Sequence, residues 1–129
     1  MAQTALDLSP EQWRSYRPGH LIGAGNAGQT KRLQRRRRQA WRVARQAAEL
    51  LRDQYDADKV VVFGSLVRDD WFTPWSDIDL AAWGIPPDRF YGAVAAVTGL
   101  SAVFKVDLID LETCRPAVRE AVARDGVEL

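Results

Sequence analysis

The sequence predicts an α+β fold, in which a mixed β-sheet packs against helices. Three observations carry this prediction. Residues 60–63 are β-prone and end abruptly at Gly64, which is typical of a buried strand. Polar and apolar residues alternate over 77–80 and 103–109, as in strands with one buried face. Between 30 and 55, apolar residues recur at three- and four-residue steps, which indicates an amphipathic helix.

Composition favours one globular domain. The 129 residues leave little room for a second domain, and a hydrophobic share of 47% is enough for a core. We assign residues 1–28 to an N-terminal extension or linker with a short helix, and 29–129 to the main domain. A single Cys114 and a single His20 exclude an internal disulfide and a Cys–His zinc cluster, which fits a cytoplasmic protein. Neither a membrane span nor a signal peptide is expected.

The first 28 residues contain two local signals. Ser9 as N-cap and Pro10 at the first helical position predict a short helix. The Gly-rich stretch 21–29 predicts a linker, although 23–28 formally matches a dinucleotide-binding pattern. That pattern needs a preceding strand and an acidic residue after the next strand, and neither is present. We therefore expect no dinucleotide site here.

The predicted helix over 30–55 carries four consecutive arginines, residues 35–38. Consecutive charges spread around a helix, so this run need not form one binding face. Two interpretations stay open. The run is a solvated helical surface, or it contacts an acidic partner or a nucleic acid backbone.

The candidate site begins where the central strand ends. Gly64 removes Cβ bulk, and Ser65 supplies a hydroxyl group and the start of a short helix whose N–H groups would face a phosphate. Arg68 lies one turn further, where it could approach the phosphates or pair with a carboxylate. In the next strand, Asp77 and Asp79 point to the same face. Like charges side by side repel unless a cation lies between them, and Mg²⁺ binds both carboxylate and phosphate oxygens.

The remaining elements follow in order. A helix is expected from the prolines at 86–87 to Gly99, a strand over 103–109, and a helix over 116–124 that stops at Gly126. The strand places a third carboxylate, Asp107, which could also be an ordinary exposed acid. Four further acids are expected outside the site, in the loop or beyond the strand: Asp69, Asp70, Asp110 and Glu112.

These residues carry a family resemblance. Gly64-Ser65, Arg68 and the tetrad at 76–79 resemble the signature of the DNA polymerase β-like nucleotidyltransferases: Gly-Ser, a spacer, Asp-x-Asp. The short chain resembles the minimal nucleotidyltransferase (MNT) group of that superfamily from about residue 35 to 129. One departure is a slightly longer spacer, which carries Trp71, Phe72 and Trp75.

The resemblance implies the nucleotidyltransferase fold for 29–129 and an enzyme that moves a nucleoside monophosphate from a nucleoside triphosphate. ATP is the expected donor and two Mg²⁺ ions are the expected cofactors. The implied catalytic residues and metal ligands are Asp77, Asp79 and Asp107. The implied nucleotide-binding residues are Gly64, Ser65 and Arg68.

The resemblance also implies a partner. MNT proteins are commonly paired with HEPN proteins as antitoxin and toxin, so adenylylation of a HEPN ribonuclease toxin is the expected function. Trp71, Phe72, Trp75 and the basic helix are candidate contacts for the toxin, or else they only pack within the domain. The alternatives are a non-catalytic antitoxin that neutralises by binding alone, and a nucleic acid binder that uses the run Arg35 to Arg38. Nucleic acid is the less expected partner.

Overall fold

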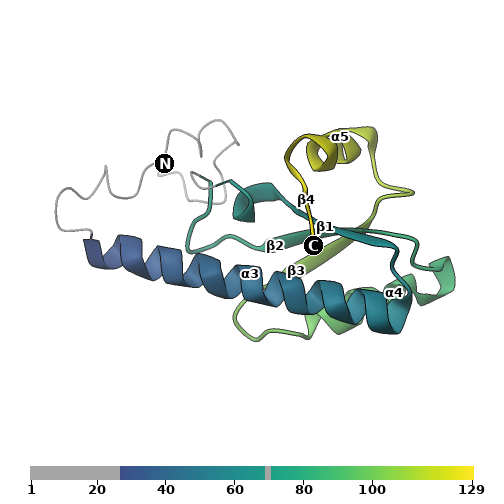
Figure 1. The fold of residues 1–129 in the computed structure, drawn as a ribbon, viewed down its shortest axis with the longest axis horizontal. Helices are drawn as coiled ribbons and strands as arrows, with labels where there is room; N and C mark the ends of the chain where they lie inside the picture. Colours follow the sequence, from purple (N-terminus) through teal and green to yellow (C-terminus); the bar gives the residue numbers. More distant parts are fainter. Residues whose placement is uncertain (1–26, 69–70) are drawn as a thin grey trace, which may run out of the picture.

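The computed structural model describes residues 27–68 and 71–129. The predicted short helix, most of the Gly-rich stretch, and Asp69 and Asp70 lie outside these residues. In chain order the elements are α3 (Ala27–Tyr55), β1 (Lys59–Phe63), the 3₁₀ turn η3 (Gly64–Leu66), β2 (Ile78–Trp83), α4 (Pro87–Thr98), β3 (Val106–Asp110), α5 (Pro116–Asp125) and β4 (Val127–Glu128) (Figure 1).

The described strands form one mixed sheet with the order β3-β2-β1-β4. β1 is antiparallel to β2 and to β4, while β2 and β3 are parallel. The helices α3 and α4 cover one face of the sheet and α5 covers the other (Figure 1). The predicted α+β class is therefore confirmed.

Successive side chains of β1 point to opposite faces of the sheet and contribute to an apolar cluster on each face. Val60 and Val62 are fully buried and belong to the large apolar cluster beneath α3 and α4. Val61 points to the opposite face and belongs to a smaller cluster that includes Val122 of α5. A strand covered on both faces reads as a continuous apolar run, which is why residues 60–63 show no alternation in sequence.

Helix α3 covers the sheet with small side chains. Its buried stripe contains Ala40, Ala44, Ala47 and Leu51, all at 0% exposure. Alanines at these positions let the helix approach the sheet closely and suit a long helix, because alanine has the highest intrinsic helix propensity. The helix begins at Ala27, slightly before the predicted start.

Two elements differ from the expected ones. β3 begins at Val106 instead of residue 103, because Ser101 Oγ accepts the N–H groups of Val103 and Phe104 at 3.0 and 3.1 Å. Such local side-chain bonds compete with the strand ladder. β4 was not predicted, since two residues are too few to show a period. Among the described residues, no helix combines the length and apolarity needed to cross a membrane.

Two glycines give a matched stability test. At Gly126, an added Cβ would overlap the Val122 carbonyl oxygen and lie 2.5 Å from Val61 Cγ1. Gly126→Ala is therefore expected to lower the free energy of unfolding by roughly 1–3 kcal/mol. Gly92 lies inside α4, and its Cβ would make only an ordinary 3.5 Å contact with Tyr55. Gly92→Ala is expected to raise stability by about 0.5–1 kcal/mol, because alanine favours the helix.

Urea unfolding followed by circular dichroism measures both changes. Equal effects of the two substitutions would contradict the packing described at the end of α5.

Candidate active site

The three predicted aspartates come from two adjacent strands. Asp79 of β2 is the direct register partner of Asp107 of β3, and Asp77 lies one residue before β2. Ile78 and Leu80 are fully buried on the opposite face. Because alternate side chains share a face, all three carboxylates are directed away from the large core.

The protonation behaviour of these groups shows that they share one environment. Burial first, and then the negative charges of Asp107 and Asp77, together raise the pKa of Asp79 to about 6, while Lys105 opposes the rise. Burial also raises the pKa of Asp77, followed by repulsion from Asp107, and Lys105 again opposes. Mutual repulsion of this kind is characteristic of sites that bind cations or exchange protons.

Lys105 is a residue of the site that sequence reasoning missed. Its Nζ lies 3.7 Å from Asp107 Oδ1; the Lys105 side chain is exposed and the Asp107 side chain is half-buried. Its carbonyl accepts the Ile78 N–H at 2.9 Å, which continues the parallel register. The signal was present in the sequence, since a residue two positions before Asp107 falls on the same side of a strand.

The Gly-Ser turn lies directly against the Asp79 carboxylate. Gly64 has φ +79°, a conformation that side chains rarely adopt, and an added Cβ would lie 2.6 Å from Asp79 Oδ2. Ser65 follows within η3 and is half-buried. Only glycine allows this turn and this carboxylate to come so close, so the structure brings Gly64 and Ser65 to the edge of the aspartate group.

Two long-range contacts hold the turn in place. Arg37 of α3 donates from Nε and Nη2 to the Leu66 carbonyl at 3.1 and 2.8 Å. From the other side, Arg68 donates from Nη1 to Asp125 Oδ1 at 3.1 Å, and its guanidinium lies 4.1 Å from the Trp71 ring. Asp125 sits at the end of α5.

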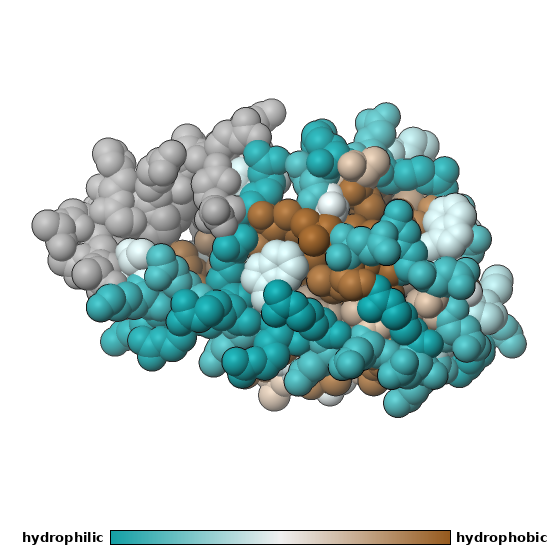
Figure 2. All heavy atoms as spheres, in the orientation of Figure 1, coloured by the Kyte–Doolittle hydropathy of each residue, from teal (hydrophilic) through white to brown (hydrophobic). Residues whose placement is uncertain are grey.

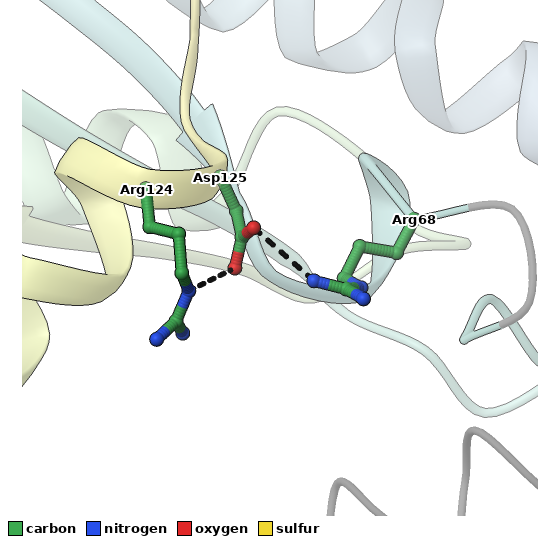
Figure 3. A network of polar contacts seen from close by, with 3 residues as sticks. All are labelled: Arg68, Arg124 and Asp125. Atoms are coloured by element: carbon green, nitrogen blue, oxygen red, sulfur yellow. Dashed lines mark hydrogen bonds and ion pairs between the residues drawn. The ribbon is translucent and has the colours of Figure 1, made fainter.

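Figure 3 shows that Asp125 lies between two arginines, since Arg124 donates from Nε to its other oxygen at 3.2 Å. Arg68 was expected either to approach the phosphates or to pair with a carboxylate, and in this structure it pairs with the carboxylate of Asp125. Its contact with a nucleotide stays a prediction. Nothing in the local sequence pointed to Asp125 as the partner.

The loop before Asp77 is ordered by hydroxyl groups. Ser76 Oγ accepts the Thr73 N–H at 2.9 Å, and Thr73 Oγ1 accepts the Trp75 N–H at 3.2 Å. Thr73 is buried, and Phe72 next to it joins the core. Trp75 by contrast is 57% exposed. The three aromatic residues of the spacer thus divide: Phe72 packs inside, Trp71 stacks on Arg68, and Trp75 faces outward.

The described surface is hollowed beside α5. Hollows of about 630 and 490 Å³ lie beside α5 and are lined by residues such as Trp83, Leu111, Cys114 and Arg119. Neither is lined by the three aspartates. Within 27–68 and 71–129, no three acidic, histidine or cysteine side chains are close enough to form a ready-made metal cage. The donor set nevertheless suits a hard divalent cation, because it consists of carboxylates that repel one another.

Comparison with known proteins agrees with this geometry. Residues 45–129 match the family model described as polymerase beta, nucleotidyltransferase. The comparison with curated proteins gave no match.

Several solved structures are similar in fold. One is a mutant of the MntA–HpeT toxin–antitoxin, 26% identical, covering 66% of this chain and 69% of that chain, with a TM-score of 0.53. Another is a toxin–antitoxin with AMP-PNP, 21% identical over 66% and 70%, with a TM-score of 0.54. A third is a tri-AMPylated Shewanella oneidensis HEPN toxin in complex with MNT antitoxin, 20% identical over 69% and 70%, with a TM-score of 0.51.

The family model spans both aspartate strands, the Gly-Ser turn and the C-terminal helix, so it covers the three aspartates, Gly64, Ser65 and Arg68. The chain therefore belongs to the polymerase beta nucleotidyltransferase family.

Proposed function

We propose that this protein transfers AMP from ATP to a HEPN-type toxin and thereby acts as its antitoxin. The observation that carries the proposal is the register pairing of Asp79 with Asp107 beside the Gly64 turn. Family membership supports nucleotidyl transfer in general. The similar structures include a complex with AMP-PNP and a tri-AMPylated HEPN toxin bound to its MNT antitoxin, which supports ATP as donor and a protein as acceptor.

In this proposal Asp77, Asp79 and Asp107 would hold two Mg²⁺ ions, which would supply positive charge to neutralise the phosphates. Burial and the negative charges of Asp107 and Asp77 raise the pKa of Asp79 to about 6, and a bound cation would relieve the repulsion between the carboxylates. Asp107 is more exposed than Asp79, so it can accept the proton of the attacking hydroxyl group from the acceptor side.

The chain's other residues bind and orient the donor. The Gly64 backbone and the Ser65 hydroxyl group approach the β- and γ-phosphates, since no Cβ stands between the turn and Asp79. Arg37 keeps the turn fixed through the Leu66 carbonyl. Arg68 lies beside the same turn, and it offsets phosphate charge if it exchanges Asp125 for the nucleotide.

An exposed tryptophan two residues before Asp77 suits a macromolecular acceptor. Trp75 is exposed on a loop that is ordered by Thr73 and Ser76, two residues from Asp77. Exposed tryptophans on rigid elements are frequent anchors of protein interfaces. We therefore place the toxin contact at Trp75.

The direct test is incubation of the protein with ATP, Mg²⁺ and its HEPN-type toxin, followed by intact-mass measurement of the toxin. A gain equal to one or more AMP groups is expected. If no mass is added and the toxin still forms a tight complex with Asp77→Ala, neutralisation works by binding alone and the transferase proposal is wrong.

Replacing a carboxylate of the site should greatly slow AMP transfer without unfolding the protein. Asp107→Asn is expected to slow AMP transfer by about a hundredfold or more, because it removes charge where the phosphoryl group reacts. Asp110→Asn is the matched control, since it changes an aspartate of the same strand that only accepts the Glu112 N–H at 2.8 Å. Initial rates of toxin labelling measure both. Equal losses in the two variants would exclude a special role for Asp107.

The raised pKa of Asp79 predicts a pH-dependent stability. The folded form binds the Asp79 proton more tightly than the unfolded form. At low pH, where Asp79 is protonated in both forms, it does not lower the free energy of unfolding. Its ionisation lowers that free energy progressively between about pH 4 and 6. In EDTA at pH 8, Asp79→Asn should therefore be more stable than wild type by roughly 2–3 kcal/mol, and equally stable near pH 4.

Urea unfolding at several pH values measures this difference, with Asp53→Asn on exposed α3 surface as control. Added Mg²⁺ should stabilise the wild type and not the Asp79→Asn variant. A difference between wild type and variant that does not change with pH would refute the electrostatic account.

Substitution of the exposed Trp75 is expected to impair toxin binding and nothing else. Trp75→Ala should weaken toxin binding roughly 30-fold, as expected of an interface hot spot, and leave ATP binding unchanged. Trp83→Ala is the control, because Trp83 is also exposed (43%) and lies at the opposite end of β2. Calorimetric titrations with toxin and with ATP separate the two effects. Similar toxin affinities for both variants would place the contact elsewhere.

A further inference from the structure

The outer surface of α3 carries a straight row of basic side chains. Its members follow one another at steps of four, three, four and three residues, and all are exposed: Lys31, Arg35, Arg38, Arg42 and Arg45. At 3.6 residues per turn they fall within an arc of about 80° and span about 21 Å of the helix. We call these five residues the basic stripe. Figure 2 shows hydrophilic side chains gathered along α3.

The stripe is not the run of four arginines seen in the sequence. Arg36 faces the protein, with its guanidinium 4.4 Å from the centre of the Phe104 ring. Arg37 is bound to the Leu66 carbonyl. The two middle arginines of the run are thus engaged in the fold, while Arg35 and Arg38 join basic residues one turn before and after them. As expected, the four consecutive arginines are spread around the helix. The five residues of the basic stripe, in contrast, lie on one side of it.

The positive charge of the stripe is not neutralised within the described part of the chain. No acidic residue occurs in α3 before Glu49, and none of the five residues forms an ion pair with another described residue. Residues 1–26 contain two acidic and two arginine residues, so their composition offers no compensating negative charge. The whole protein carries only +1, which makes the stripe a local feature.

The chemistry of the stripe favours a polyanion over a protein. Protein interfaces are anchored by aromatic side chains and arginine together with apolar side chains that form a desolvated centre. Among the described residues, the large apolar side chains that are exposed all lie outside α3: Trp75, Trp83, Tyr91, Val103 and Val127. The stripe instead consists mainly of arginine, whose planar guanidinium binds phosphate oxygens in pairs.

The shape of the stripe favours a single strand. A row one side chain wide follows one phosphate backbone. Trp41 lies on its flank between Arg38 and Arg45, is partly exposed, and has the Arg45 guanidinium 5.6 Å from its ring. Proteins that bind single strands combine a basic track with aromatic rings on which unpaired bases stack.

We propose that the basic stripe of α3 binds the phosphodiester backbone of a single-stranded nucleic acid. This activity is additional to AMP transfer. The stripe lies opposite the buried alanine face of α3, so it points away from the sheet and from the aspartates on its far side.

Fluorescence anisotropy with a labelled oligouridylate tests the proposal on the full chain. Five phosphate contacts predict a slope of about −3.5 in log Kobs against log salt, or about a hundredfold loss between roughly 50 and 200 mM salt. Arg35→Gln/Arg38→Gln/Arg42→Gln should reduce the slope to about −1.4. The same three positions changed to lysine should keep it near the wild-type value, because the charges remain.

The matched control is Lys59→Gln/Arg89→Gln/Arg115→Gln, which removes the same charge from exposed positions outside α3. It should keep the wild-type slope. Wild-type protein should show a similar slope with oligothymidylate, which carries the same phosphodiester charge although its sugar lacks the 2′-hydroxyl. Three results would overturn the proposal. The first is an equal decrease of the salt slope in the control variant, and the second is tighter binding of a duplex than of the single strand. The third is tighter binding of polyglutamate than of the single strand, which would indicate an acidic protein partner. AMP transfer measured on the same variants should be unchanged, so the two proposals fail independently.

Discussion

The repulsion among three carboxylates is the constraint on which the site depends. The parallel register of β2 and β3 places Asp79 beside Asp107, and Asp77 follows from the same alternation. Burial and like charge together raise the pKa of Asp79 to about 6. The fold tolerates this cost because Ile78, Leu80, Val106 and Leu108 anchor the same two strands in the core from the opposite face. A protein that maintains such repulsion has a site prepared for cations.

The Gly-Ser turn is held in place by long-range contacts from two helices. It is fixed by Arg37 from a helix that precedes it and, through Arg68, by Asp125 from a helix near the end of the chain. Gly64 lets the turn contact Asp79, which a side chain would prevent. Phosphoryl transfer depends mainly on positioning and charge neutralisation. A turn clamped from both sides against the carboxylates provides the positioning.

The two outward surfaces of the molecule differ in chemistry. The edge near Asp77 combines carboxylates, Lys105 and an exposed tryptophan, Trp75, which suits a protein acceptor. The outer face of α3 combines cations with no large exposed apolar side chain, which suits a polyanion. The carboxylates and α3 lie on opposite faces of the sheet.

Local sequence patterns predicted the elements, and the Gly-Ser and Asp-x-Asp motifs with their family resemblance supplied the candidate site residues. The steps of apolar residues predicted α3, prolines and glycines bounded α4 and α5, and the alternation around Asp79 and Asp107 put their side chains on the solvent side of the strands. These features are local, since they depend on neighbours a few residues away. The short β4 and the late start of β3 escaped prediction because two residues show no period and a serine side chain displaced the ladder.

Only the tertiary structure decided which of these residues meet. The strand register placed Asp107 opposite Asp79, the choice of ion partner joined Arg68 to Asp125, and the packing of α3 turned Arg37 inward while leaving Arg35 and Arg38 outside. Each contact joins segments far apart in the chain. Their pairing is set by the packing of whole elements, which no local pattern encodes.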